Sequence, residues 1–305
     1  MVFFVCIERS AKSTTILLLS IFCLFFYGCN SKKKVYEYAV EPSLNKGNFT
    51  IVSDTSIVDI FGQCIVAYEH LYDSAHIEVR YRTDENVINV LENKESQIGA
   101  LHRKLTNNEY NRLLKVYSTM PLEKIFAYDA IVIATAHRTS DTSMNLLQVK
   151  QMLQKEGIGW ATLPQYQYLF KVLLEHFDIK DNKKPLTLVD NIEKLSQLAS
   201  QRDMLCVLPF SSFSDEDNAS HRAIRAMFSF ISIINEDKVV VYPSQEDIYL
   251  QLYPLIIPYN MVLCKVKRSE GMGFVNFLFS PQVGKMMLKN GLVPAKMPER
   301  LVEIK

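Results

Sequence analysis

The residues of this 305-residue chain that could do chemistry are polar side chains at predicted turns. "GNFTIVSDTS" predicts a strand that ends in the polar turn 53–56. A helix is predicted next, because apolar residues recur at three- and four-residue steps over 57–71. Oxygens of Asp, Ser and Thr at such a turn accept hydrogen bonds from the free N–H groups of a helix start. The turn can therefore cap the helix or contribute to a ligand site.

Nothing in the sequence assembles a catalytic set. No nucleophile can be matched to a base, and no GxSxG, Walker-type glycine loop or HExxH motif occurs. "SDEDNASHR" lacks the glycine and spacing of a calcium loop, so we interpret it as solvated. The histidines show no pair at ligand spacing and are interpreted as surface or capped residues: His102, His137, His176 and His221. We therefore predict no enzymatic activity, no cofactor and no metal.

Residues 1–28 are typical of a secretory signal. Arg9 and Lys12 precede the apolar run 15–26, which is shorter than the roughly 20 residues of a membrane-spanning helix. The segment "FYGC" resembles a bacterial lipobox, with bulkier first residues than usual, so Cys29 would become the lipid-modified first residue of the mature chain. The alternative is an uncleaved anchor helix. Either way we expect the body to be tethered to a membrane outside the cytoplasm, in the periplasm or cell envelope.

The body that follows is predicted to be α/β. Removing residues 1–28 lowers the formal net charge from +1 to zero, which gives no support for nucleic-acid binding. Residues 29–46 are predicted to be a polar tether. Strand and helix patterns then alternate through strands at 76–82 and 127–135, which indicates a largely parallel sheet. Thr106 and Glu109 predict a capping box.

The second half of the chain gives further expectations. Residues 146–198 are predicted to be mostly helical, with loops at 155–165 and 178–188. The apolar run 252–266 contains two prolines, so it should bend or lie at a sheet edge. Two helices joined at Ser280 are predicted near the end of the chain. Apolar surroundings predict buried side chains for Cys64, Cys206 and Cys264.

Several segments together resemble the PstS-like phosphate-binding lipoproteins that feed ABC transporters. "GNFTIVSDTS", "HIEVRYRTDENVINVL", "HRKLTNNEY", "AYDAIVIAT", "LYPLIIPYNMVL" and "GFVNFLFSPQVGKMMLKNGLVPAKMPER" occur in that family's order. The resemblance covers residues 47–305. It implies a two-lobed periplasmic binding protein fold of type II, a Venus flytrap with mixed sheets flanked by helices and a ligand cleft. Lobe one would contain residues 47–129 and 257–305, and lobe two residues 130–256.

The resemblance also implies an oxyanion site. Helix N-termini, hydroxyl groups and an arginine fork hold such a ligand. In lobe one, Thr83 lies at the second strand-to-helix turn, and Arg103 lies where relatives have an arginine before "LT". The first such turn supplies Asp54, Thr55 and Ser56. For each hydroxyl residue, plain helix capping is the competing interpretation.

Lobe two departs from the family pattern. Relatives place a Ser-Gly-Thr-like turn where this chain has Leu163, Pro164 and Gln165, and they often carry an arginine after "YPL". Pro164 has no N–H to donate, so Thr162, Gln165 and Tyr166 remain as weaker polar substitutes. The resemblance predicts an extracytoplasmic solute-binding lipoprotein that passes phosphate or a related oxyanion to an ABC permease. These departures keep a second hypothesis open, in which a binding-protein fold without a small ligand acts as a structural or interaction lipoprotein.

Overall fold

The computed structural model describes residues 46–136, 143–179, 185–201, 204–265 and 271–298. The predicted signal segment and Cys29 lie outside these ranges. Within the described ranges, no helix is both long enough and apolar enough to cross a membrane.

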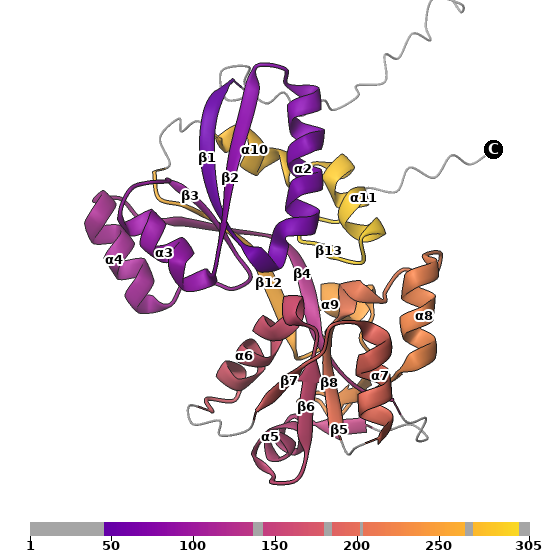
Figure 1. Ribbon diagram of the computed structural model, residues 1–305. Coiled ribbons are helices and arrows are strands. Elements are labelled where there is room, and N and C mark those ends of the chain that lie inside the picture. Colours follow the sequence, from indigo (N-terminus) through magenta and orange to yellow (C-terminus); the bar gives the residue numbers. More distant parts are fainter. Residues whose placement is uncertain (1–45, 137–142, 180–184, 202–203, 266–270, 299–305) are drawn as a thin grey trace, which may run out of the picture. The chain divides into compact units, whose positions relative to one another are not determined.

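The described residues build one large mixed sheet and one small sheet (Figure 1). The strands are β1 (Gly47–Asp54), β2 (Ala75–Arg82), β3 (Ile98–Leu101), β4 (Leu122–Thr135), β5 (Ser143–Asn145), β6 (Gly159–Thr162), β7 (Leu186–Leu188), β8 (Met204–Pro209), β9 (Ser229–Phe230), β10 (Ser232–Ile234), β11 (Val240–Val241), β12 (Ile256–Leu263) and β13 (Val293–Pro294). The large sheet has the order β2-β1-β3-β12-β4-β8-β6-β7, with β13 and β9 also paired to β4. The small sheet has the order β11-β10-β5. The predicted α/β class is confirmed.

Strand β4 connects the two halves of the large sheet. Its residues 122–130 pair antiparallel with β12, and its residues 131–134 pair antiparallel with β8. On one side of this change, β1 lies parallel to β2 and β3; on the other, β6 lies parallel to β7 and β8. The predicted lobe boundary at residues 129 and 130 lies where β4 changes partner, and it stays a prediction.

Two hydrophobic clusters cover the two faces of the first half of the sheet. The helices here are α2 (Val58–Leu71), α3 (Asp84–Glu92), α4 (Asn107–Tyr117), α10 (Met272–Phe277) and α11 (Pro281–Lys289). Successive side chains of a strand point to opposite faces. Accordingly, Ile51 packs in the cluster that contains Phe61 of α2 and Phe274 of α10, whereas Val52 packs in the cluster that contains Leu91 of α3 and Leu113 of α4. Figure 1 shows α2, α10 and α11 on one side of these strands and α3 and α4 on the other.

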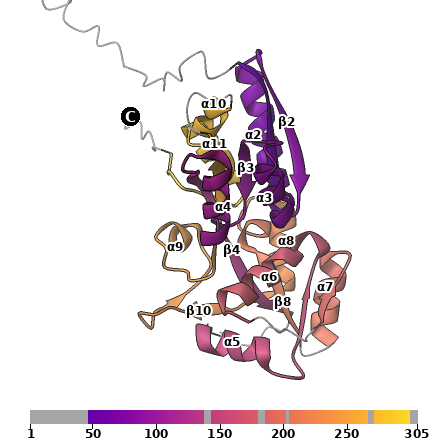
Figure 2. The same ribbon diagram turned by 90° about the vertical axis from the view of Figure 1, so that its left-hand side faces the viewer.

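Helices also cover the second half, where α6 and α7 pack against β8, and α8 packs against α7 (Figure 2). The helices of this half are α5 (Leu146–Gln154), α6 (Gln167–His176), α7 (Ile192–Gln201), α8 (Ala219–Met227) and α9 (Gln245–Tyr249). Two predicted loops were wrong in part, because 155–165 contains β6 and 178–188 contains β7. Both strands are only three or four residues long, so neither shows a recognisable alternation.

Of the two alternatives predicted for the run 252–266, a bend or a position at a sheet edge, the edge position was wrong for β12. This strand lies in the interior of the sheet, between β3 and β4. Pro258 pairs with Tyr128, and the register then shifts between Tyr259 and Asn260. An irregular ladder at this point accommodates a residue that cannot donate a backbone hydrogen bond. The expected largely parallel sheet was wrong in part, because β12 and β4 pair antiparallel with their neighbours in the middle of the large sheet. Three further predictions for the body are confirmed: the capping box on α4, the helices on either side of Ser280, and the buried side chains of Cys64, Cys206 and Cys264.

Candidate ligand-binding site

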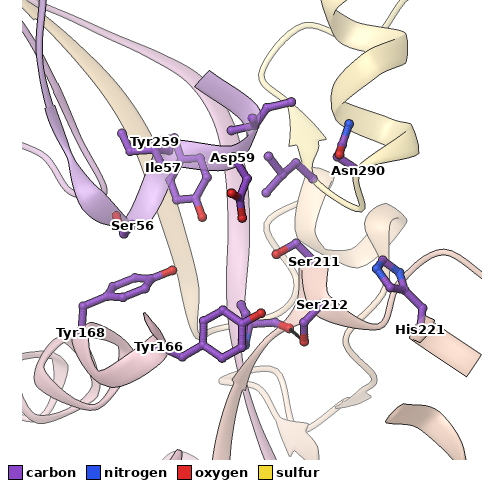
Figure 3. Close-up of a pocket in the computed structure, with 13 residues that line it drawn as sticks. Ser56, Ile57, Asp59, Tyr166, Tyr168, Ser211, Ser212, His221, Tyr259 and Asn290 are labelled. Carbon is purple, nitrogen blue, oxygen red and sulfur yellow. Dashed lines mark hydrogen bonds between the residues drawn. The ribbon is translucent and has the colours of Figure 1, made fainter. Parts of the chain in front are cut away.

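Two pockets lie near the point where β4 changes partner, and residues from both halves of the sheet line them. The first pocket has a volume of about 220 Å³ (Figure 3). Its polar lining consists of Ser56, Asp59, Tyr166, Tyr168, Ser211, Ser212, His221, Tyr259 and Asn290. The second pocket, of about 610 Å³, shares Tyr168 with the first. Its lining includes Asp54, Thr55, Thr83, Asp84, Glu85, His102, Gln165, Phe170 and Lys171.

The predicted turn at 53–56 lies at these pockets, but Asp54 is already engaged. Its Oδ1 accepts a hydrogen bond of 2.7 Å from the N–H of Ser56, which caps the 3-10 helix Thr55–Ile57. Its Oδ2 lies 3.0 Å from Nδ1 of His102, and both side chains are buried. The expectation of a surface or capped position for His102 was wrong. The sequence contains only half of the signal for this pair: Asp54 ends β1 and His102 directly follows β3, but that these strands are parallel neighbours is seen only in the structure.

The other hydroxyl residues of lobe one also line the pockets. The buried Oγ of Ser56 has no hydrogen-bond partner among the described residues. Thr83 precedes α3 without capping it through its side chain, and its Oγ1 accepts a hydrogen bond of 3.0 Å from Asn86. Thr55, Thr83 and Gln165 line the second pocket. The structure therefore brings five predicted site residues to the two pockets.

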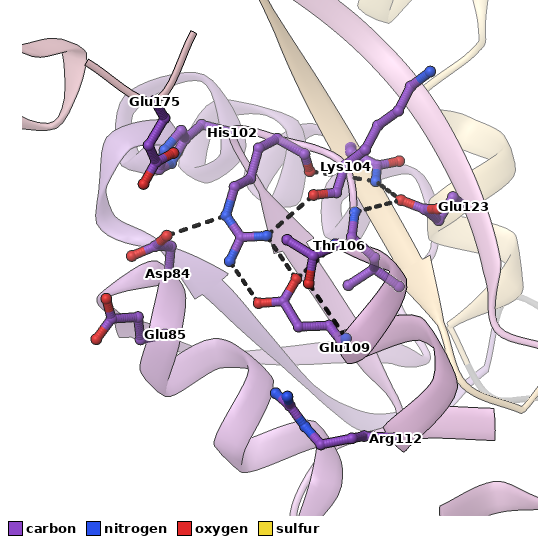
Figure 4. Close-up of polar contacts among 12 residues, drawn as sticks. Asp84, Glu85, His102, Lys104, Thr106, Glu109, Arg112, Glu123 and Glu175 are labelled. Carbon is purple, nitrogen blue, oxygen red and sulfur yellow. Dashed lines mark hydrogen bonds and ion pairs between the residues drawn. The ribbon is translucent and has the colours of Figure 1, made fainter. Parts of the chain in front are cut away.

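Thr162 and Arg103 line neither pocket. Thr162 is fully buried, and its hydroxyl donates a hydrogen bond of 2.6 Å to the carbonyl oxygen of Val207, so it joins β6 to β8. Arg103 is held by carboxylates (Figure 4). Its Nη1 and Nη2 each lie 2.8 Å from an oxygen of Glu109, and its Nε lies 3.1 Å from Asp84.

These contacts satisfy the positive charge of Arg103 within the chain. Glu109 raises the pKa of the guanidinium more than burial lowers it, so the group stays charged. Burial alone would raise the pKa of Asp84, but Arg103 and Lys171 outweigh it and hold that pKa below its ordinary value. The forked contact with Glu109 is the geometry that an oxyanion would otherwise occupy on an arginine.

Carboxylates outnumber cations around the second pocket. Lys171 of α6 is the only lysine or arginine among the described residues that line either pocket. Its Nζ lies 3.4 Å from Asp84 and 3.2 Å from Glu85, the first two residues of α3. Acidic side chains in the first turn of a helix neutralise the positive end of its dipole. The start of α3 is thus already supplied with negative charge from its own chain.

A buried carboxyl group that the sequence did not single out lies behind the first pocket. Asp129 of β4 is fully buried, and burial raises its pKa. It accepts hydrogen bonds of 2.6 Å from Oγ of Ser211, 3.0 Å from N of Ser211 and 2.7 Å from N of Ala130. The hydroxyl of Tyr259 lies 3.4 Å away, and the first pocket is lined by both Tyr259 and Ser211. This group thus ties together β4, β12 and the 3-10 helix Phe210–Ser212.

The pattern of the sequence alone could not have assembled the first pocket. Tyr166 and Tyr168 lie two residues apart, in the 3-10 helix Pro164–Tyr166 and in α6, whereas Tyr259 lies in β12, about ninety residues further along the chain. His221, predicted to lie at the surface or in a cap, lines the pocket and accepts a hydrogen bond of 3.1 Å from the N–H of Asp215. Within the described ranges, no group of His, Cys, Asp and Glu is arranged to hold a metal ion.

Comparison with known proteins identifies the class of fold. Residues 39–167 match the family model of the PBP superfamily domain. The PstS protein of Borrelia burgdorferi has a similar structure, with a TM-score of 0.62 and 16% identity over 82% of this chain and 99% of that one. An ABC-type phosphate transport receptor of Vibrio cholerae gives a TM-score of 0.63 and 15% identity over 81% and 99% of the two chains.

A third similar structure contains its ligand. A phosphate ABC transporter substrate-binding protein of Clostridium perfringens with bound phosphate gives a TM-score of 0.60 and 17% identity, over 82% of this chain and all of that one. No curated protein matches the chain by sequence. The chain therefore has the two-lobed fold of the periplasmic binding proteins. More particularly, this is the fold of the PstS-type substrate-binding proteins of phosphate ABC transporters, and the predicted resemblance is confirmed at this level.

Proposed function

We propose that this protein is an extracytoplasmic solute-binding lipoprotein that captures a small solute between its two lobes and delivers it to an ABC permease. The observation that carries the proposal is the position of the two pockets. They lie where β4 changes partner, and sequence-distant elements from both halves of the sheet line them. Closure around a solute in such a cleft is a population shift, driven by contacts that exist only in the closed state.

The prediction that the solute is phosphate or a related oxyanion has support from the proteins of similar fold, two of which are described as phosphate transport proteins and one of which contains phosphate. The charged side chains give this prediction less support, because Arg103 lines neither pocket and Lys171, which lines the second, already pairs with carboxylates of the chain. Burial of a phosphate dianion with too few hydrogen-bond donors costs on the order of several kcal/mol, because the free energy of removing it from water is not compensated.

Isothermal calorimetry with phosphate, sulfate and molybdate, titrated separately into the purified chain, tests the oxyanion prediction. Saturable binding of any of the three would support it. Intrinsic fluorescence is a less direct probe, because Trp160 is fully buried and lines neither pocket, although its ring lies 5.6 Å from that of Phe170 in the second pocket.

Lipid anchoring is part of the proposal and has its own test. Cys29→Ala should abolish labelling of the protein with a radioactive fatty acid, and it should release the chain from the membrane fraction if the signal segment is still cleaved. Retention of both properties by the variant would contradict a lipid attached at Cys29.

The second candidate is a binding-protein fold that has lost its small ligand and acts as an interaction lipoprotein. One observation favours it: the chain's own carboxylates satisfy both Lys171, which lines the second pocket, and Arg103, the arginine that the sequence assigned to the ligand. Failure of every small solute to bind, together with co-purification of a permease or another envelope protein, would support this candidate over solute capture. That the protein is not an enzyme stays a prediction.

A further inference from the structure

Two serine hydroxyl groups that line the first pocket already donate their hydrogen atoms to other groups of the chain. Oγ of Ser211 donates to Asp129 at 2.6 Å, and Oγ of Ser212 donates to the carbonyl oxygen of Pro209 at 2.8 Å. A serine hydroxyl has one hydrogen to donate and two lone pairs that accept. Towards the pocket, both serines can therefore only accept hydrogen bonds.

Asp59 adds a carboxylate to this lining. It lies in the first turn of α2, and it makes no hydrogen bond or ion pair to any other described residue. A negative charge in the first turn also stabilises the helix dipole, and this effect by itself would explain an aspartate at position 59. In Figure 3, however, its carboxylate points into the space that faces Ser211 and Tyr166. An ionised carboxylate only accepts hydrogen bonds.

Three tyrosine hydroxyls complete the ring of polar groups. Burial is the main cause that raises the pKa values of Tyr166, Tyr168 and Tyr259, so these side chains stay protonated and uncharged. Figure 3 shows their hydroxyl groups directed towards the same space. The first pocket is lined by no lysine or arginine from the described chain.

A phosphate dianion matches this lining poorly, since Asp59, Ser211 and Ser212 offer its oxygens only acceptors, and the side-chain hydroxyl donors that remain, on Ser56 and the tyrosines, are uncharged. A solute rich in hydroxyl or ammonium groups provides the missing donors, and the tyrosine rings provide apolar surface beside them. Acidic residues also outnumber basic residues in the lining of the second pocket, where Asp54, Asp84 and Glu85 are accompanied by Lys171 and His102.

On the basis of the proposed function, which places the solute in this cleft, we propose that the solute of the first pocket carries no net negative charge and donates hydrogen bonds to Asp59, Ser211 and the tyrosine hydroxyls. Such a solute is a small compound that fits a volume of about 220 Å³ and whose polar groups mainly donate hydrogen bonds. Hydroxyl groups and ammonium groups are the two possible donors.

Calorimetry with three probes tests this inference on the purified chain: myo-inositol, 1,4-diaminobutane and inorganic phosphate. We expect saturable binding of the polyol or the diamine, and none of phosphate. Binding of the polyol alone assigns hydroxyl donors, and binding of the diamine alone assigns ammonium donors.

Paired variants then locate the site. Asp59→Asn should weaken binding of the diamine about 10- to 100-fold, as for loss of a charged hydrogen bond, or that of the polyol about 2- to 10-fold. Asp73→Asn, at the other end of α2 and outside both pockets, should change neither. Tyr166→Phe, which removes only a hydroxyl, should weaken binding about 2- to 10-fold relative to the exposed control Tyr242→Phe.

The failures are distinguishable. Binding of phosphate without either donor probe would overturn the inference and leave the proposed function intact. Binding of no probe would overturn the inference, and failure with sulfate and molybdate as well would count against solute capture. Equal affinities for Asp59→Asn and Asp73→Asn would overturn the assignment of Asp59, because a residue that only stabilises the start of α2 would not affect binding.

Discussion

Arg103→Ala separates the two roles that this arginine could have. The sequence predicts a ligand contact, so removal of the side chain should abolish oxyanion binding. In the structure, Arg103 instead pairs with Asp84 and Glu109 and lines neither pocket. The structure therefore predicts a loss of stability and no direct loss of a ligand contact.

The size of the loss follows from three short contacts, of 2.8, 2.8 and 3.1 Å, made by a side chain that is 19% exposed. Exposed ion pairs contribute about 0–1 kcal/mol, whereas removing one partner of a fully buried pair costs about 3–5 kcal/mol. Because Arg103 lies between these limits, we expect Arg103→Ala to lower the free energy of unfolding by about 2 kcal/mol, or the melting temperature by about 4–8 °C for a domain of this size.

The difference between wild type and Arg103→Ala should also depend on pH. The folded state lowers the pKa values of Asp84 and Glu109, with Arg103 among the causes. Stability from such groups is fully present above their unfolded pKa values, about 3.9 and 4.3, and is lost as the pH falls through the lower folded values. The difference in melting temperature should thus be largest near pH 7 and should shrink below about pH 4.

Thermal unfolding followed by circular dichroism measures this effect. Arg112→Ala is the matched control, because Arg112 also pairs with a carboxylate, Glu92, but its side chain is 51% exposed. We expect it to change the free energy of unfolding by less than about 0.5 kcal/mol. Arg103→Lys, which keeps the charge but loses the fork, should lie between alanine and wild type. An unchanged melting temperature for Arg103→Ala, together with abolished oxyanion binding, would refute this interpretation of Arg103.

Three further predictions concern stability. Burial raises the pKa of Asp129, so the stability of the wild type should fall relative to that of Asp129→Asn as the pH rises from about 4 towards the folded pKa. Chemical denaturation at pH 5 and pH 8 measures this change, and a difference in stability that stays constant would contradict it. Gly62→Ala should stabilise the protein by about 0.5–1 kcal/mol because an added Cβ meets nothing within 4 Å inside α2, whereas Gly271→Ala should cost about 1–3 kcal/mol because φ is +92° and the Cβ would collide with the side chain of Ile98. Equal melting temperatures of the two variants would contradict this pair of predictions. Lys171→Gln should lower the free energy of unfolding by less than about 1 kcal/mol, since its side chain is 46% exposed, and a larger loss in urea denaturation would show that its ion pairs hold the two halves together.

The fold was predictable because long amphipathic patterns determine it. The helical spacing over 57–71 and the alternation over 76–82 each bury one face, and α2 and β2 lie there. The short strands β6 and β7 were not predictable, because three or four residues carry too little periodicity. The interior position of β12 was missed because Pro258 argues against a central strand unless an irregular ladder accommodates it.

The candidate site was less predictable, because it depends on which polar groups meet after folding. The turn 53–56 was found because it follows a strand and precedes a helix, a purely local signal. The pairing of Asp54 with His102 and the burial of Asp129 require the register of the sheet, which no local pattern specifies. Arg103 was assigned to the ligand by its position before "LT", whereas the orientation of its side chain is set by Glu109, six residues later.

The helix-capping residue Glu109 occupies the donor groups of Arg103 that an anion would otherwise bind. Its carboxylate accepts a hydrogen bond of 2.8 Å from the N–H of Thr106, as the capping box requires, and it also receives both Nη atoms of Arg103. An incoming oxyanion would have to displace the carboxylate of Glu109, which its own helix holds in place. The conformational entropy of that side chain was already lost when the chain folded, so its contact with Arg103 costs no further entropy. A free anion loses translational freedom on binding as well, so the intramolecular carboxylate has the advantage. Oxyanion binding through the forked face of Arg103 therefore requires Glu109 to move away from it, and a solute that donates hydrogen bonds elsewhere in the cleft requires no such change.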